Sequence, residues 1–222
     1  SGLVGSEMCI RDRNISGFTK LDEFVKNIES PRKILLMVPS GEATKSVADE
    51  LLEMLDNDDI LIDGGNSFYK DSVELGNKCK EKKIRFVGMG VSGGETGARH
   101  GPALMLGTDD TISKNLLSMI KSISAKSSYG DCVGVYKGYG TGHFIKMLHN
   151  GIEYAEMQIL AESYSILKSS NFSNLEISNF FKSLKEKNQS SYLIEISSEI
   201  IKKKANNEYL IDNISPVANN KG

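Results

Sequence analysis

The chain lacks the features that mark several large classes of protein. Its 222 residues carry a formal net charge of only −2, so it has no basic surplus of the kind that binds nucleic acid. No apolar run approaches the roughly 18 residues that a membrane-spanning helix needs, so we expect no membrane partner. Cysteine is scarce: Cys9, Cys79 and Cys132 are three in number and show no CxxC spacing. This pattern favours reduced thiols in the cytoplasm over a disulfide framework or a metal site.

A dinucleotide fingerprint is also missing, because no GxGxxG follows any apolar run. The nearest match, Gly88-Met89-Gly90, continues into Val91-Ser92-Gly93 and not into an ordinary helix. In a dinucleotide-binding fold, that fingerprint belongs to the first turn between strand and helix. The remaining composition, 39% hydrophobic and 25% charged, is that of one or two globular domains.

Short apolar runs alternate with amphipathic patterns over the first 140 residues. They predict strands at 34–38, 60–62, 84–87 and 103–106, a strand stub at 15–18, and helices at 21–28, 42–55, 70–82 and 112–123. This alternation predicts an α/β domain with a parallel, doubly wound sheet. After Gly142 the strand pattern ends, and helices are predicted at 142–169, 174–186 and 190–204 as the start of an all-α domain.

The helix that follows the glycine-rich loop 138–142 carries a row of polar side chains. Its residues Lys146, His149, Asn150 and Glu153 are spaced i, i+3, i+4 and i+7. They therefore share one helical face, with Lys146 and Glu153 about 10 Å apart along the axis. A solvated polar face with a charge pair is the alternative. Against it stand the glycine-rich loop and the mid-helix Gly151, since glycine in such places indicates a close approach to the backbone.

Two further loops follow predicted strands, where open α/β sheets bind their ligands. The first, Asp63-Gly64-Gly65-Asn66-Ser67, offers the amide of Asn66 as both donor and acceptor. In the second, Ser92 and the N–H groups of Gly93 and Gly94 suit a carboxylate or a phosphate. Either loop alone is also compatible with a plain turn, and Arg99 and His100 are expected in a polar surface loop.

Three segments, GTGHFIKMLHNGIEYAEMQ, IDGGNSFYKD and GVSGGETGARHGPALM, resemble the signatures of decarboxylating 6-phosphogluconate dehydrogenases in the family's order. The resemblance runs from about residue 15 to the end. It implies the C-terminal portion of an NADP-binding, Rossmann-like domain at 14–139 and the beginning of the family's all-helical C-terminal domain at 140–222. Residues 1–13 match nothing in the family and stay unassigned, and we expect them to be foreign to the native protein. The strand at 34–38 then corresponds to the family's fourth strand, so we expect a chain cut at both ends and inactive alone.

The resemblance also implies roles for individual residues. Lys146 would act as base, then acid, then base, and Glu153 as the acid that protonates carbon. The implied substrate-binding residues are Asn66, Ser92, Gly93, Gly94, His149, Asn150, Tyr154 and Lys221, and the implied cofactor-binding residues are Val38, Pro39, Ser40 and Asn66. Pro39 stands where many family members have a lysine beside the cofactor phosphates, which bears on the preference for NADP over NAD.

The implied activity is the oxidative decarboxylation of 6-phosphogluconate to ribulose 5-phosphate and CO2, with reduction of NADP. This would place a homodimeric enzyme in the pentose phosphate pathway and in gluconate utilization. One alternative is a related β-hydroxyacid dehydrogenase, which shares an SGG loop and a helix-borne lysine with an amide four residues on. Such an enzyme would not need the HNGIEY continuation found here. The other alternative is a truncated, non-catalytic remnant.

Overall fold

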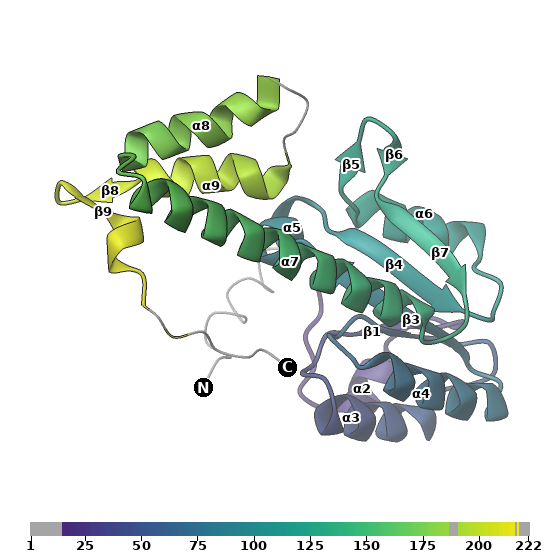
Figure 1. Ribbon diagram of the computed structural model, residues 1–222. Helices are drawn as coiled ribbons and strands as arrows, with labels where there is room; N and C mark the ends of the chain where they lie inside the picture. The colour runs from purple at the N-terminus through teal and green to yellow at the C-terminus, as the bar shows by residue number, and fades with distance from the viewer. Residues whose placement is uncertain (1–14, 187–190, 216, 218–222) are drawn as a thin grey trace. The chain divides into compact units, whose positions relative to one another are not determined.

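A computed structural model describes residues 15–186, 191–215 and 217 of the chain (Figure 1). The chain forms two compact units, Ser1–Met147 and Leu148–Gly222. Their boundary falls inside the long helix α7 (Thr141–Ser169) and not in the glycine-rich loop before it. Within the described ranges, no helix is long and apolar enough to cross a membrane.

The first unit is built on a five-stranded sheet of order β1-β2-β3-β4-β7. The strands are β1 (Lys33–Leu36), β2 (Ile60–Asp63), β3 (Arg85–Ser92), β4 (Ala103–Thr108) and β7 (Val133–Lys137). β1, β2 and β3 run parallel, and β4 and β7 run parallel to each other, but β4 pairs with β3 in the antiparallel direction. The predicted Rossmann-like α/β architecture is confirmed, although the sheet is mixed and not wholly parallel. The link 93–102 between β3 and β4 is shorter than the dozen or so residues that a parallel crossover needs.

Helices cover both faces of this sheet, as the doubly wound prediction requires (Figure 1). On one face, α2 (Leu21–Lys26), α3 (Glu42–Leu52) and α4 (Tyr69–Glu81) pack on strand residues such as Leu61 and Phe86. Tyr139 completes this core, with its ring 5.8 Å from that of Phe86 in an edge-to-face arrangement. On the other face, α6 (Lys114–Ile123) packs on the strand residues of opposite parity, among them Ile60 and Ile62.

Several local predictions were wrong. Residues 15–18 form no strand. Arg99 and His100 lie in helix α5 (Gly94–His100) and not in a loop. β7 was not predicted, because its sequence VGVYK is short, interrupted by glycine and half-exposed. Two hairpins of two-residue strands were also not predicted: β5 (Lys126–Ser127) with β6 (Gly130–Asp131), and β8 (Lys204–Ala205) with β9 (Glu208–Tyr209).

The second unit is mainly helical, as predicted. The rest of α7 packs with α8 (Asn174–Glu186), α9 (Tyr192–Lys202) and the 3-10 turn η1 (Leu210–Asn213). Ile177, Phe181 and Ile201 form its buried core. The hydroxyl of Ser178 donates to the carbonyl of Ser198 at 2.6 Å and ties α8 to α9. The apolar spacing in the sequence therefore located all three helices to within two residues at each end.

Candidate active site

The turns that follow the parallel strands hold most of the predicted ligand-binding residues of the first unit. Val38, Pro39 and Ser40 follow β1, and the carbonyl of Pro39 accepts a hydrogen bond from Thr44 Oγ1 at 2.9 Å. Asn66 follows β2, in a turn where the Asp63 carboxylate accepts from Gly65 N–H at 3.0 Å. These two turns touch, because a Cβ atom placed on Gly65 would lie 3.1 Å from the Val38 carbonyl oxygen. The residues predicted to hold the cofactor therefore lie together at the carboxyl edge of the sheet.

The third loop begins at Ser92, the half-buried last residue of β3. Gly93 and Gly94 follow with φ angles of 139° and 57°, in the left-handed region that glycine adopts at little cost. Both glycines are exposed. The local conformation therefore explains why glycine is needed here, and it leaves the backbone open to a ligand.

Helix α7 begins with its backbone directly against the sheet. A Cβ atom placed on Gly142 would lie 2.2 Å from the carbonyl oxygens of both Gly88 on β3 and Met105 on β4. One turn further on, a Cβ atom on Gly90 would lie 2.6 Å from Cβ of Lys146. Any side chain at these glycines would push the helix off the sheet. Because these glycines have no side chains, Lys146 packs against Gly90 of β3, which is two residues before Ser92.

The contact that joins two of the predicted motifs is made by Lys146. Its Nζ atom donates to Oδ1 of Asn66 at 3.1 Å, although the two residues are 80 positions apart in the chain. Lys146 is half-buried and Asn66 is exposed at the sheet edge. A predicted general base and a predicted substrate ligand are thus in direct contact.

One residue of this site was missed by the sequence analysis. His143, in the first turn of α7, is only 3% exposed. Its Nε2 lies 3.1 Å from the carbonyl oxygen of Gly65, and its Nδ1 lies 2.7 Å from the hydroxyl of Ser72 on α4. Burial lowers the pKa of His143 below its ordinary value; the Asp63 carboxylate opposes this shift and Lys146 adds to it. The available signal was its position between Gly142 and Lys146, three residues before the lysine.

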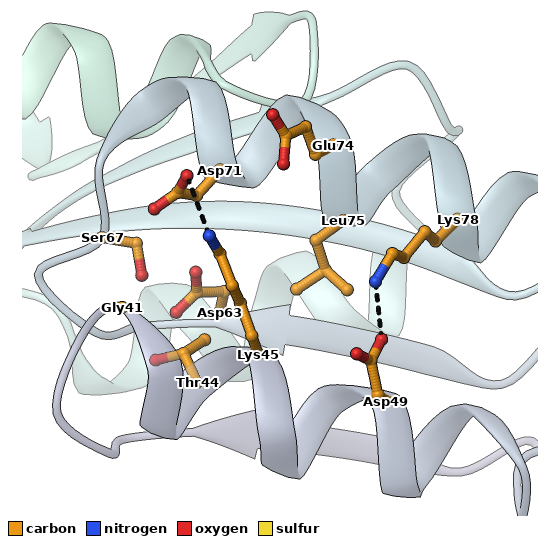
Figure 2. Close-up of a pocket in the computed structure, with 10 residues that line it drawn as sticks. All are labelled: Gly41, Thr44, Lys45, Asp49, Asp63, Ser67, Asp71, Glu74, Leu75 and Lys78. Carbon is orange, nitrogen blue, oxygen red and sulfur yellow. Dashed lines mark hydrogen bonds and ion pairs between the residues drawn. The ribbon is translucent and has the colours of Figure 1, made fainter.

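A groove between α3 and α4 is lined in part by Asp63 and Ser67 (Figure 2). Lys45 reaches from α3 to Asp71 on α4 at 3.6 Å, and Lys78 reaches back from α4 to Asp49 at 2.8 Å. The enclosed volume is about 90 Å³, room for a few water molecules. Ser67 Oγ, which lines it, is buried without a hydrogen-bond partner among the described residues. This volume is too small for a sugar phosphate, so we assign the groove no ligand.

In the second unit, His149 and Glu153 line a cavity of about 270 Å³ together with Ile152, Glu156, Ser191, Tyr192 and Leu193. His149 Nδ1 lies 3.8 Å from the carboxylate of Glu153 and 3.4 Å from Oδ1 of Asn150. Tyr154, predicted to contact the substrate phosphate, is 69% exposed. Lys221 lies outside the described residues. Three of the predicted polar residues therefore lie close together on α7, two of them at a cavity.

Two family models match the chain. The NAD binding domain of 6-phosphogluconate dehydrogenase matches residues 6–136, and the C-terminal domain of 6-phosphogluconate dehydrogenase matches residues 142–222. The chain belongs to the 6-phosphogluconate dehydrogenase family. The first match begins inside the segment 1–13 that the sequence analysis left unassigned. The family suggested by the three motifs is thus confirmed.

Similar proteins of this family include the decarboxylating 6-phosphogluconate dehydrogenases of Staphylococcus epidermidis, 48% identical over 187 residues, and Staphylococcus aureus, 45% identical over 189 residues. These matches cover 83% and 84% of this chain, which spans 40% of the length of each relative. A solved structure of Plasmodium falciparum 6-phosphogluconate dehydrogenase is 35% identical with a TM-score of 0.87. The match covers 98% of this chain and 48% of the Plasmodium falciparum chain.

A more distant solved structure bears on the alternative that the chain is a related β-hydroxyacid dehydrogenase. The 3-hydroxyisobutyrate dehydrogenase of Mycobacterium tuberculosis is 14% identical with a TM-score of 0.59, over 84% of this chain and 77% of its own. At that identity the two proteins share a fold. The 6-phosphogluconate dehydrogenases match both the fold and the sequence.

Proposed function

We propose that this family member catalyses the oxidative decarboxylation of 6-phosphogluconate to ribulose 5-phosphate and CO2, with reduction of NADP. The observation that carries the proposal is the 3.1 Å hydrogen bond between Lys146 and Asn66, which brings together two of the three motifs. Further support comes from the Plasmodium falciparum relative, whose structures include complexes with its cofactor NADP+ and its substrate 6-phosphogluconate.

Oxidation of a secondary alcohol requires a base that removes the hydroxyl proton, and we assign this role to Lys146. A lysine acts as a general base when its surroundings hold it neutral. The packing of Lys146 against Gly90 fixes its stem, and the bond to Asn66 holds its amine at the open edge of the sheet. The Asn66 amide also has an N–H₂ group with which it would hold a substrate hydroxyl beside that amine.

NADP fits the same edge of the sheet. The touching turns after β1 and β2 expose Pro39 and Asn66, and Gly65 lacks the side chain that would fill the space beside the Val38 carbonyl. Val38, Pro39, Ser40 and Asn66 would therefore hold the cofactor, with Asn66 where the nicotinamide meets the substrate. When bound there, the nicotinamide accepts the hydride from the substrate carbon. Proline brings no positive charge to the cofactor phosphates, so NAD is the alternative cofactor.

The second half of the reaction needs an acid as well as a base. The β-keto acid formed by the oxidation loses CO2 and leaves an enediol. Carbon must then receive a proton while a hydroxyl loses one. We assign the carbon-directed proton to Glu153 and the hydroxyl proton to Lys146, both on α7. The proposed substrate ligands are Asn66, Ser92, Gly93, Gly94, His149, Asn150, Tyr154 and Lys221.

The family relationship also supports assignments of oligomeric state, cellular compartment and pathway. We propose that the enzyme works as a homodimer in the cytoplasm, in the pentose phosphate pathway and in gluconate utilization. Gel filtration with light scattering on the purified protein would test the dimer.

The activity is best tested in a chimera. The matching segment of the Staphylococcus epidermidis enzyme is replaced by residues of this chain, so that the relative supplies the remainder of its own length. We expect 6-phosphogluconate to reduce NADP in this chimera, whereas 3-hydroxyisobutyrate does not. No reduction with 6-phosphogluconate in a folded, NADP-binding chimera would overturn the proposal.

Two variants separate the proposed roles. Lys146→Met should abolish NADP reduction, since loss of a general base costs about 10²–10⁴-fold. Glu153→Gln should leave the first turnover of NADP reduction largely intact and slow the release of ribulose 5-phosphate. Lys168→Met and Glu162→Gln, on the exposed far end of α7, are matched controls that should leave both steps unchanged. If Glu153→Gln removes the reduction burst as fully as Lys146→Met does, the division of labour is wrong.

A further inference from the structure

The buried imidazole of His143 connects three segments that are distant in sequence. It lies at the start of α7, contacts Ser72 on α4, and contacts the backbone of Gly65 in the turn after β2. Ser72 is itself 1% exposed, so its contact with the imidazole is buried, whereas the contact with Gly65 is partly buried. The mechanism proposed above gives His143 no chemical step. Its burial and its contacts therefore need another explanation.

These two contacts favour one tautomer of the ring, which also interacts with the backbone of Met89 on β3. A carbonyl oxygen can only accept, so Nε2, 3.1 Å from the Gly65 carbonyl, must carry a hydrogen. In the neutral ring Nδ1 is then an acceptor, and the Ser72 hydroxyl donates to it at 2.7 Å. The charged groups that act on the ring are Asp63 at the end of β2 and Lys146 on α7. Burial outweighs the carboxylate and favours the neutral ring.

The carbonyl that His143 holds is next to the residue that contacts the lysine. Gly65 directly precedes Asn66, and Asn66 accepts a hydrogen bond from Lys146 at 3.1 Å. His143 and Lys146 are three residues apart on α7 and so lie on the same side of the helix. One helical face thus holds the turn at two adjacent points: the backbone through the imidazole and the side chain through the amine.

We propose that His143, as the neutral Nε2–H tautomer oriented by Ser72, is a positioning residue that fixes Asn66 relative to Lys146. Its catalytic consequence rests on the proposed function, whereas the tautomer and the ordering of the turn do not. Without the imidazole, the Gly65 carbonyl loses its donor, and the turn is joined to α7 through the exposed amide of Asn66 while the Gly65 N–H stays bonded to Asp63. A displacement of about 1 Å at that point is enough to cost about 10²-fold in rate.

Three variants test the proposal. His143→Gln retains an amide N–H for the Gly65 carbonyl and an amide oxygen for the Ser72 hydroxyl. His143→Leu fills much of the same space without either bond. His100→Gln, at the exposed end of α5, is the matched control.

The first measurement uses the 222-residue chain and needs no enzymatic activity. Imidazole nitrogen NMR should show the Nε2–H tautomer for His143 in the unmodified chain. Hydrogen exchange should be faster in His143→Leu only for the backbone around 64–67, and near normal in His143→Gln. An Nδ1–H tautomer would overturn the proposal, as would unchanged exchange in the leucine variant. If the leucine variant does not fold, the tautomer and the glutamine variant still decide.

The second measurement is kinetic and uses the chimera described above. We expect His143→Leu to lower kcat by about 10–10²-fold, and His143→Gln to restore most of the loss. Equal losses in both variants would overturn the positioning role. If the chimera itself is inactive, the proposed function fails, while the NMR and exchange results still judge the state of His143.

Discussion

Because the first turn of α7 packs closely on the sheet, we expect alanine substitutions at two glycines of this helix to have opposite effects on stability. Gly142 and Gly151 both lie in α7. A Cβ atom on Gly142 would lie 2.2 Å from two backbone oxygens, whereas a Cβ atom on Gly151 would meet nothing within 4 Å among the described residues. We therefore expect Gly142→Ala to destabilise the chain and Gly151→Ala to stabilise it.

The magnitudes follow from the two environments. Replacing a helical glycine by alanine gains about 1 kcal/mol in an open position, and this is the expected gain for Gly151→Ala. At Gly142 the obstructing atoms are backbone oxygens that cannot rotate away, so helix and strands must separate. Overpacking of this kind costs about 1–3 kcal/mol or more, and we expect a net loss of about 2 kcal/mol.

Urea denaturation followed by far-UV circular dichroism would measure both changes. Because Gly142 and Gly151 belong to different compact units, hydrogen exchange on peptides from each unit would assign the change in stability to its source. If Gly142→Ala proves as stable as the unmodified chain, the backbone contact between α7 and β3 is not as close as described. A loss of stability in Gly151→Ala would equally refute the argument.

Three other predictions concern single side chains. Because burial lowers the pKa of His143 below 6.5, the unfolded chain takes up a proton that the folded chain does not as the pH falls below that value. The free energy of unfolding should then decrease by up to about 1.4 kcal/mol per pH unit, and urea melts should show this slope reduced in His143→Gln. Burial raises the pKa of the Cys79 thiol to about 12, so a thiol reagent followed by peptide mapping should label Cys79 only after unfolding. In the chimera, Pro39→Lys should tighten the Kd for NADP more than that for NAD, measured by cofactor titration; equal changes would remove the basis of that prediction.

The sequence predicted the fold best where its apolar pattern is strong. The run that became β2 is apolar because both of its faces are buried, and the helices show a clear apolar stripe. The run that became β1 was also predicted, although Leu35 on one of its faces is 44% exposed. The antiparallel direction of β4 was missed, because side-chain alternation carries no information about strand direction. The short link 93–102 was the signal for it.

The site was predicted unevenly for a similar reason. Asn66 and Lys146 stood out as members of motifs, but their contact across 80 residues depends on how α7 packs on β3. His143 carries no distinctive pattern, since a single histidine beside glycines is equally compatible with a surface turn. Gly151 was interpreted as a point of close approach, but a Cβ atom there would meet nothing within 4 Å in the described part of the chain. Close approach occurs instead at Gly142.

One buried and one half-buried tyrosine allow each unit of the chain to be followed by optical spectroscopy. The sequence contains eight tyrosines and no tryptophan, so its near-ultraviolet absorption comes largely from tyrosine. Tyr139 packs on Phe86 in the first unit, and Tyr164 donates to Asn174 in the second; burial raises the pKa of both phenols. Tyr129, by contrast, is fully exposed between β5 and β6. In an alkaline titration, the raised pKa values of Tyr139 and Tyr164 delay their ionisation, and each phenol then reports the opening of its own unit without an introduced label.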